Sequence, residues 1–136
     1  LAVVIKLSKP IIFDKPLTRI GDWMFANRLS LTGVTIPDGV KTIGSYAFYQ
    51  CGSLKSITIP ESVTRVEYYA LYYCSTLVSI YCKATTPPTI SGDSVFDYNR
   101  ADRKIYVPKA SVDAYRAAEG WSEYADDIVG YDFLAI

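Results

Sequence analysis

The sequence LTGVTIPDGVKTIGSYAFYQCGS, residues 31–53, is followed at once by LKSITIPESVTRVEYYALYYCST, residues 54–76. Nine of the 23 aligned positions are identical, and most of the others differ conservatively. Such a fixed period indicates a repeat protein, in which each unit is stable only when it stacks on its neighbours. The chain is therefore predicted to form a solenoid with a 23-residue repeat.

The same spacing extends the repeat in both directions. Residues 11–13 align with residues 34–36, and after a two-residue insertion residues 105–108 align with residues 57–60. About five rungs are predicted.

Each rung contains a three-residue alternation such as Ile57-Thr58-Ile59. Side chains alternate along a β-strand, so the two isoleucines are predicted to point inward and the middle residue outward, on a narrow parallel sheet. A proline such as Pro60 is expected to end the strand. The apolar positions of residues 40–48 are predicted to form the opposite wall as a turn or a single helical turn.

A single domain is expected, since half of the 136 residues are hydrophobic. Residues 1–10 are expected to form an N-terminal strand and turn, 11–108 the repeats and 109–136 a C-terminal cap. Val3, Ile5 and Leu7 alternate, which indicates either a cap or a truncated earlier coil.

A short helix is predicted in the C-terminal cap, with Ser111 as its N-cap, Asp113 in its first turn and Gly120 at its end. Val112, Tyr115 and Ala118 would share one helical face. Together with Trp121 they are expected to cover the open core of the last rung.

Charge excludes several partners. Lys plus Arg equals Asp plus Glu at 14 each, so nucleic acid is not an expected partner.

The chain has no stretch approaching the ~20 apolar residues of a transmembrane segment. It begins at Leu1, partway into an apolar run, so a signal or lipid anchor is expected upstream of that residue.

The unit at residues 31–53 resembles the repeat of the BspA-like leucine-rich-repeat family of bacterial surface proteins. The matching positions are Leu31, Val34, Ile36-Pro37, Val40, Ile43-Gly44, Ala47-Phe48 and Cys51. The segment IYVPKASVDAYRAAEGWSEYADDI resembles the C-terminal cap of that family. Arg28, at the position of Cys51, and Glu67, at that of Gly44, depart from the pattern. The resemblance implies a right-handed leucine-rich-repeat solenoid that is extracellular or at the bacterial cell surface and takes part in adhesion or partner binding.

Catalytic and metal sites are not expected, because the chain has no His. Asp97 and Asn99 hint at a calcium loop, but Pro108 stands where the bidentate Glu is needed. Asp126 and Asp127 are interpreted as solvated charges. No enzyme activity and no cofactor are therefore predicted.

The cysteines are interpreted as core residues. Cys51 and Cys74 lie one period apart in the same column, and Cys82 occupies the inward position of Ile59. Because free Cys packs as a small apolar residue, a buried thiol column is favoured over a disulfide or a metal site.

Tyrosine is in excess, with 12 residues. Trp23, Tyr46 and Tyr69 recur in one column and are interpreted as wall packing. Tyr68, Tyr72 and Tyr73 form a possible exposed aromatic patch, suited to protein interfaces or to stacking on sugar rings, although simple tyrosine enrichment of a surface protein is an equal alternative.

The main candidate site is the concave face of the strands. Its predicted contacts project outward from successive strands: Thr35, Ser56, Thr58, Ser79, Tyr81, Lys104 and Tyr106. The sheet would be ~20 Å long and ~10 Å wide, and its footprint of ~200 Å² is well below the ~800 Å² per partner of a standard interface. Three functions remain open: binding a host or bacterial protein through this face, binding a glycan through exposed tyrosines, or serving as a spacer or cap of a larger surface protein.

Overall fold

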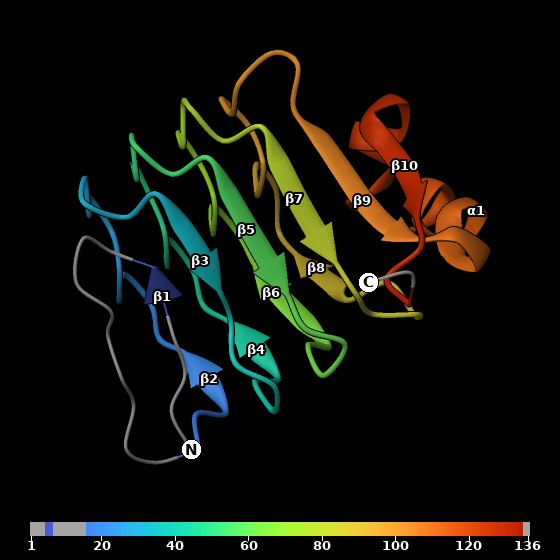
Figure 1. Cartoon of the computed structure of the whole chain (residues 1–136), viewed down its shortest axis with the longest axis horizontal. Helices are drawn as coiled ribbons and strands as arrows, with labels where there is room; N and C mark the ends of the chain where they lie inside the picture. Colours follow the sequence, from blue (N-terminus) through green and yellow to red (C-terminus); the bar gives the residue numbers. More distant parts are fainter. Residues whose placement is uncertain (1–4, 7–15, 135–136) are drawn as a thin grey trace.

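Two columns of short strands, parallel except for β1, run the length of the molecule in the computed structural model, which describes residues 5–6 and 16–134. The first is a six-stranded sheet in the order β1-β3-β5-β7-β9-β10, and the second is a four-stranded sheet in the order β2-β4-β6-β8. Figure 1 shows the two sheets as opposite walls of one coil. The first sheet consists of β1 (Ile5–Lys6), β3 (Gly33–Thr35), β5 (Ser56–Ile59), β7 (Ser79–Cys82), β9 (Lys104–Pro108) and β10 (Ile128–Tyr131).

The register of the six-stranded sheet confirms the repeat. Val34 pairs with Ile57 and Ile57 with Ile80, each one period of 23 residues apart. Ile80 then pairs with Ile105, so the two-residue insertion falls between β7 and β9 as predicted. Inward residues of these strands, such as Ile57 and Ile59, are completely buried.

The opposite wall contains the predicted turn, at residues 45–50 in the second rung, and a four-stranded parallel sheet that was not predicted. The sheet is formed by β2 (Arg19–Ile20), β4 (Thr42–Ile43), β6 (Arg65–Glu67) and β8 (Thr89–Ser91). The strands are only two or three residues long, which is too short for the alternation of side chains to be visible in the sequence. In β4 and β6 only one residue of each strand is fully buried, Ile43 and Val66 respectively.

Consecutive turns join the second sheet to the next strand of the first, at residues 22–27, 45–50, 68–73 and 95–98. Two residues near each turn have positive φ although they are not glycine. The first residue of each pair belongs to the column Trp23, Tyr46, Tyr69 and Ser94, with φ between 57° and 60°. The interpretation of Trp23 as wall packing is wrong, because this residue is 52% exposed. Tyr46 and Tyr69 are half-buried, and Ala47 and Phe48 are fully buried in the core.

At the N-terminal end, β1 pairs antiparallel with β3, with Ile5 opposite Val34. The predictions for residues 11–13, Val3 and Leu7 lie outside the described residues. Leu17, which the repeat aligns with Val40, is partly buried against the core.

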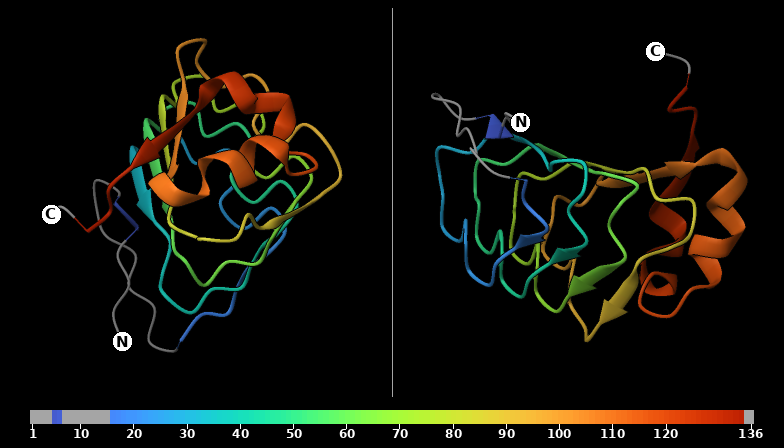
Figure 2. Two further views of the ribbon diagram at one scale, coloured as in Figure 1. Left: turned by 90° about the vertical axis from the view of Figure 1, so that its right-hand side faces the viewer. Right: turned by 90° about the horizontal axis from the view of Figure 1, so that it is seen from below.

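At the C-terminal end, helix α1 (Val112–Ala117) and a 3₁₀ helix (Ser122–Asp127) cover the last rung (Figure 2). Tyr115 and Trp121 are fully buried, as the predicted cap requires. Ser111 occupies the N-cap position, but its side chain makes no capping hydrogen bond, because the hydroxyl donates to the Thr85 carbonyl at 2.7 Å. The serine therefore fastens the cap to the preceding rung. Within the described ranges, no helix is long and apolar enough to cross a membrane.

Candidate functional site

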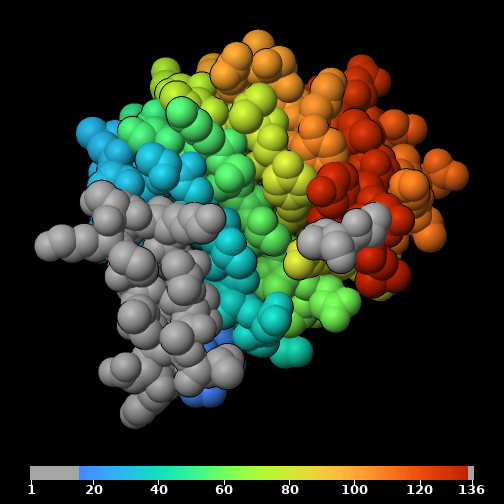
Figure 3. Space-filling view, viewed as in Figure 1, coloured from blue at the N-terminus to red at the C-terminus, as the bar shows by residue number. Residues whose placement is uncertain are grey.

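The outward residues of the six-stranded sheet form two columns, which we call the strand face. Pairing of the strands aligns Ser56, Ser79 and Lys104 in one column and Thr35, Thr58, Tyr81 and Tyr106 in the other. All seven are partly or fully exposed. The structure thus brings the predicted contacts together on one surface, which runs along the solenoid in Figure 3.

The aromatic residues at one end of the strand face pack on one another. The Tyr81 and Tyr106 rings are stacked, with centroids 4.9 Å apart. Tyr131 of β10 meets both of them edge-on at 5.4 and 5.6 Å, and Phe133 packs against Tyr131. Tyr131 and Phe133 could not be predicted from the repeat, because β10 pairs with β9 but carries no repeat motif.

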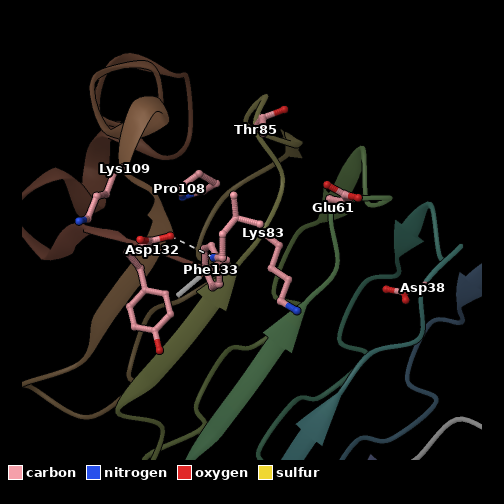
Figure 4. A pocket seen from close by; sticks show the side chains of 10 residues that line it. Asp38, Glu61, Lys83, Thr85, Pro108, Lys109, Asp132 and Phe133 are labelled. Atoms are coloured by element: carbon pink, nitrogen blue, oxygen red, sulfur yellow. Dashed lines mark hydrogen bonds between the residues drawn. The ribbon is translucent and has the colours of Figure 1, made fainter. Parts of the chain in front are cut away.

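Beside this cluster lie two open cavities. One, of about 290 Å³, is lined by Thr35, Thr58, Tyr81, Lys83, Tyr131 and Phe133. The other, of about 570 Å³, shares Lys83, Tyr131 and Phe133 and adds acidic and basic side chains. Figure 4 shows Lys83 next to Phe133, with Glu61 and Asp38 on the preceding rungs. The cavity is therefore acidic toward the N-terminal rungs and carries both charges at the other end, where Asp132 lies beside Lys109.

The turns carry a second aromatic surface, which we call the aromatic ladder. The predicted patch of Tyr68, Tyr72 and Tyr73 belongs to it, and Tyr68 and Tyr73 are 44% and 45% exposed. The ladder also contains rings that were not predicted to be exposed or were not considered: Trp23, Tyr46, Tyr49, Tyr69 and Tyr98. The positive φ of its turn positions could not be predicted from a Trp or Tyr in the sequence, since such residues rarely adopt it.

Rings of the ladder stack along the solenoid axis in three columns. Trp23 stacks on Tyr46 at 4.2 Å, and Tyr46 stacks on Tyr69 at 5.0 Å. The Tyr49 ring stacks on Tyr72 at 5.9 Å, and the Tyr73 ring on Tyr98 at 5.0 Å. Edge-on contacts join the columns; Tyr72, for example, meets both Tyr69 and Tyr98.

Desolvation by the surrounding rings, with the neighbouring phenols adding to it, raises the pKa of Tyr46 and Tyr72 above the usual value of 10.0. Their hydroxyls therefore remain protonated at neutral pH and can donate hydrogen bonds.

The polar side chains that were considered as metal ligands or catalytic groups make structural contacts. Asp97 accepts a hydrogen bond from Tyr124, and Asn99 donates to the Leu71 carbonyl. Asp127 pairs with buried Arg103 at 2.8 Å, so the interpretation of Asp127 as a solvated charge is wrong, whereas Asp126 is exposed. In the part of the chain that the structure describes, no group of three or more His, Cys, Asp or Glu residues could hold a metal ion.

All three cysteines are buried free thiols, which confirms their assignment to the core. The Cys51 thiol donates to the Phe25 carbonyl and the Cys74 thiol to the Phe48 carbonyl, so the two make equivalent contacts one rung apart. Cys82 contacts the Tyr115 hydroxyl. These thiols serve packing between rungs and between the last rung and the cap.

Comparison with known families finds that the model of the BspA type leucine-rich repeat region matches residues 5–115 in six copies, one more than the five rungs expected from the sequence. A comparison with curated proteins finds none that matches.

Proposed function

The chain belongs to the BspA-type leucine-rich-repeat family, and from that premise we propose that it is a non-catalytic interaction module that binds a protein partner through the strand face. The family's repeats form an interaction scaffold rather than a catalytic one. The fold alone does not name the ligand, so the proposal rests on the surface.

The observation that carries the proposal is the cluster of Tyr81, Tyr106 and Tyr131 beside the two cavities. Tyrosine is enriched among the residues that dominate binding energy in protein interfaces, because it combines a large rigid ring with a polar tip. The cavities add depth to a face whose flat footprint alone would be small. They suit an extended segment of a partner that inserts one or two side chains.

The charges around the larger cavity favour one orientation of the bound segment. Asp38 and Glu61 line one side, whereas Lys109 on the other side lies beside Asp132. A segment with a basic residue toward Asp38 and Glu61 would complement the acidic side. Such complementarity sets orientation and specificity more than affinity.

A secreted or surface-displayed location, in a bacterium, and a role in adhesion to a host or bacterial protein are part of the proposal. The resemblance of the repeat to bacterial surface proteins supports both. Detection of the native protein on intact cells by antibody labelling, with and without protease treatment of the cells, tests the location.

The strand face can be tested with a random peptide library displayed on phage, selected against the wild-type protein. Replacement of Tyr81 and Tyr106 by Ala should weaken binding of the selected peptides at least about tenfold, as expected from losing two central aromatic contacts. Both side chains are partly exposed, so the thermal midpoint should change little. The matched control replaces Tyr68 and Tyr73 on the aromatic ladder. Equal peptide affinity for the wild-type protein and the Tyr81→Ala/Tyr106→Ala variant would reject this face.

A further inference from the structure

The aromatic ladder is a second surface that the strand face does not use. None of its residues lines the cavities described above. Two of its rings, Trp23 and Tyr98, are more than half exposed, at 52% and 62%. The exposed aromatics form one continuous set of ring contacts, whereas scattered exposed apolar residues need no explanation.

Stacking fixes the rings before any ligand arrives. Each ring is held between the rungs by the neighbour on which it stacks, at the spacing that the parallel strands impose. A surface that is already ordered loses little side-chain entropy on binding, which favours affinity. The ladder is therefore preorganised along one line.

The polar tips of the ladder also differ from those of the buried tyrosines. Tyr115 donates its hydroxyl to the Ala84 carbonyl, and Tyr124 donates to Asp97. In the described residues, no intramolecular hydrogen bond occupies the hydroxyls of the ladder, for example those of Tyr68 and Tyr73. These phenols are available to donate to and accept from a ligand.

Most charges next to the ladder are paired. Arg19 bridges Asp22 and Glu67 at 2.8 Å each, and Arg65 lies 3.8 Å from Glu67. Asp93 adds one carboxylate, which acts on Tyr46. The ladder itself contains only Trp and Tyr, so its own surface is uncharged and complements an uncharged ligand rich in hydroxyl groups.

The ladder also exposes ring faces at its ends. Trp23 begins the first column and Tyr69 ends it, because Ser94 occupies the next position. Tyr69 is half-buried, with Tyr68 and Tyr72 edge-on to it. Tyr98 ends the column that begins at Tyr73. Within the columns the ring faces are covered by stacking, so a ligand along the axis meets ring edges and phenol hydroxyls, which can bond the sugar hydroxyls. Only the rings at the column ends can offer a face to the C–H groups of a pyranose ring.

We propose that the aromatic ladder binds a linear, uncharged polysaccharide that lies along the solenoid axis. A row that repeats with every rung matches a ligand that repeats along its length, and the spacing of 4.2 to 5.9 Å between stacked rings is close to the length of one sugar residue in an extended chain. A folded protein partner has no such repeat. The ladder and the strand face are separate sites, so this inference does not depend on the proposed function.

Affinity electrophoresis in gels containing a soluble polymer tests the inference. The probes are mixed-linkage β-glucan, xylan, galactomannan and dextran, with polygalacturonate as a charged comparison. At least one neutral polymer should retard the wild-type protein. Replacement of Tyr73 and Tyr98 by Ala should weaken that binding about tenfold or more, as expected for loss of an aromatic contact. The matched control, Tyr81→Ala/Tyr106→Ala, should bind within about twofold of the wild type, since it leaves the ladder intact.

Fluorescence gives a second readout. The chain has two tryptophans, of which Trp121 is fully buried and Trp23 is exposed in the ladder. The polymer that retards the protein should shift the emission of the wild type and leave that of Trp23→Phe unchanged. The inference would be overturned if no neutral polymer binds, or if Tyr73→Ala/Tyr98→Ala binds the polymer as the wild type does. It would also be overturned if Tyr73→Ala/Tyr98→Ala loses binding of the library peptides while polysaccharides have no effect on that peptide binding.

Discussion

Gly44 couples two neighbouring rungs. A Cβ atom at this position would lie 2.5 Å from the Asp22 carboxylate and 2.8 Å from the backbone nitrogen of Asp22 and the Ile20 carbonyl. Asp22 occupies this space because its carboxylate accepts a hydrogen bond from the Ser45 backbone. One period later Glu67 replaces the glycine, since Ser45 stands there in place of Asp22, and the Glu67 carboxylate pairs with Arg19. The departure from the family pattern therefore has a local cause.

Gly44→Ala should lower the free energy of unfolding by about 2 kcal/mol, because backbone atoms of the preceding rung cannot move aside easily. Gly21→Ala is the matched control, since it lies one period earlier and, among the described residues, the nearest atom to a Cβ there is the flexible Met24 methyl at 3.6 Å. It should change stability by less than about 0.5 kcal/mol. Urea denaturation measures both. Equal effects of the two substitutions would contradict the steric account.

Cys82 makes stability depend on pH in the alkaline range. Burial raises the pKa of its thiol from 9.0 to about 11, although the hydrogen bond with Tyr115 opposes the shift. The folded protein therefore holds this proton more tightly than the unfolded chain does. Its contribution is complete below pH 9 and is lost as the pH rises from about 9 to about 11.

The free energy of unfolding should accordingly fall by about 2 kcal/mol from this thiol over that range. Burial also raises the pKa of Tyr115 and of Tyr124, and these groups act in the same direction at higher pH. Urea denaturation at pH 7 to 11 checks the slope, and Cys82→Ala should make it shallower. If the substitution leaves the slope unchanged, the thiol is not its source.

At the scale of elements, the short strands β4 and β6 show why the second wall was not predicted. Their backbone hydrogen bonds go to neighbouring rungs, so the strands exist through stacking rather than through local sequence. The two-residue insertion is accommodated at two separate places in the rung, with one extra residue at each. Arg65 pairs with Thr89, one residue beyond the regular spacing, and the second extra residue comes at Gly92, whose φ is +102°.

Arg103 joins the irregular rung to the C-terminal cap. Its guanidinium donates to the Phe96 carbonyl at 2.7 Å and to Asp127 at 2.8 Å, and it lies over the Tyr124 ring. The side chain is almost completely buried, so these contacts are shielded from water. The C-terminal cap is thus held by hydrogen bonds as well as by the packing of Trp121.

Arg103→Met should lower the free energy of unfolding by about 2 kcal/mol or more, because it removes a buried guanidinium and leaves the Phe96 carbonyl without this partner. Arg100 forms an exposed pair with Asp102 and provides the control, Arg100→Met, which should change stability by less than about 0.5 kcal/mol. Thermal and urea unfolding measure both variants. A smaller loss for Arg103→Met than for Arg100→Met would contradict the role of this contact.

For the whole molecule, the repeat made most of the fold predictable. The alignment of residues 31–53 with 54–76 identified the inward isoleucines, the outward residues of the strand face and the buried Cys51 and Cys74. It did not predict the outward direction of Trp23, because a recurring aromatic column looks the same whether it faces the core or the solvent. Backbone dihedral angles at the turns decide between the two, and these depend on how the rungs stack.

The candidate sites were predictable only in part, for the same reason. Thr58 and Tyr81 follow from strand alternation, which has a period of two and needs no tertiary information. Tyr131 reaches the strand face from a strand outside the repeat, and Tyr98 joins the aromatic ladder from the rung that contains the insertion. Contacts between regular and irregular parts of a chain have no signature in one sequence.

The turn residues with positive φ have a consequence for variation of the surface. One position in each turn carries Trp, Tyr, Tyr and Ser in successive rungs, and the other carries Asn, Gln, Tyr and Tyr, all in the left-handed region. Trp23 and Tyr98 show that side chains placed there can lie largely in solvent. Substitutions at these positions can therefore diversify this surface while the hydrophobic interior stays the same. The solenoid therefore has two turn positions per rung at which the side chain can vary without a change of the core.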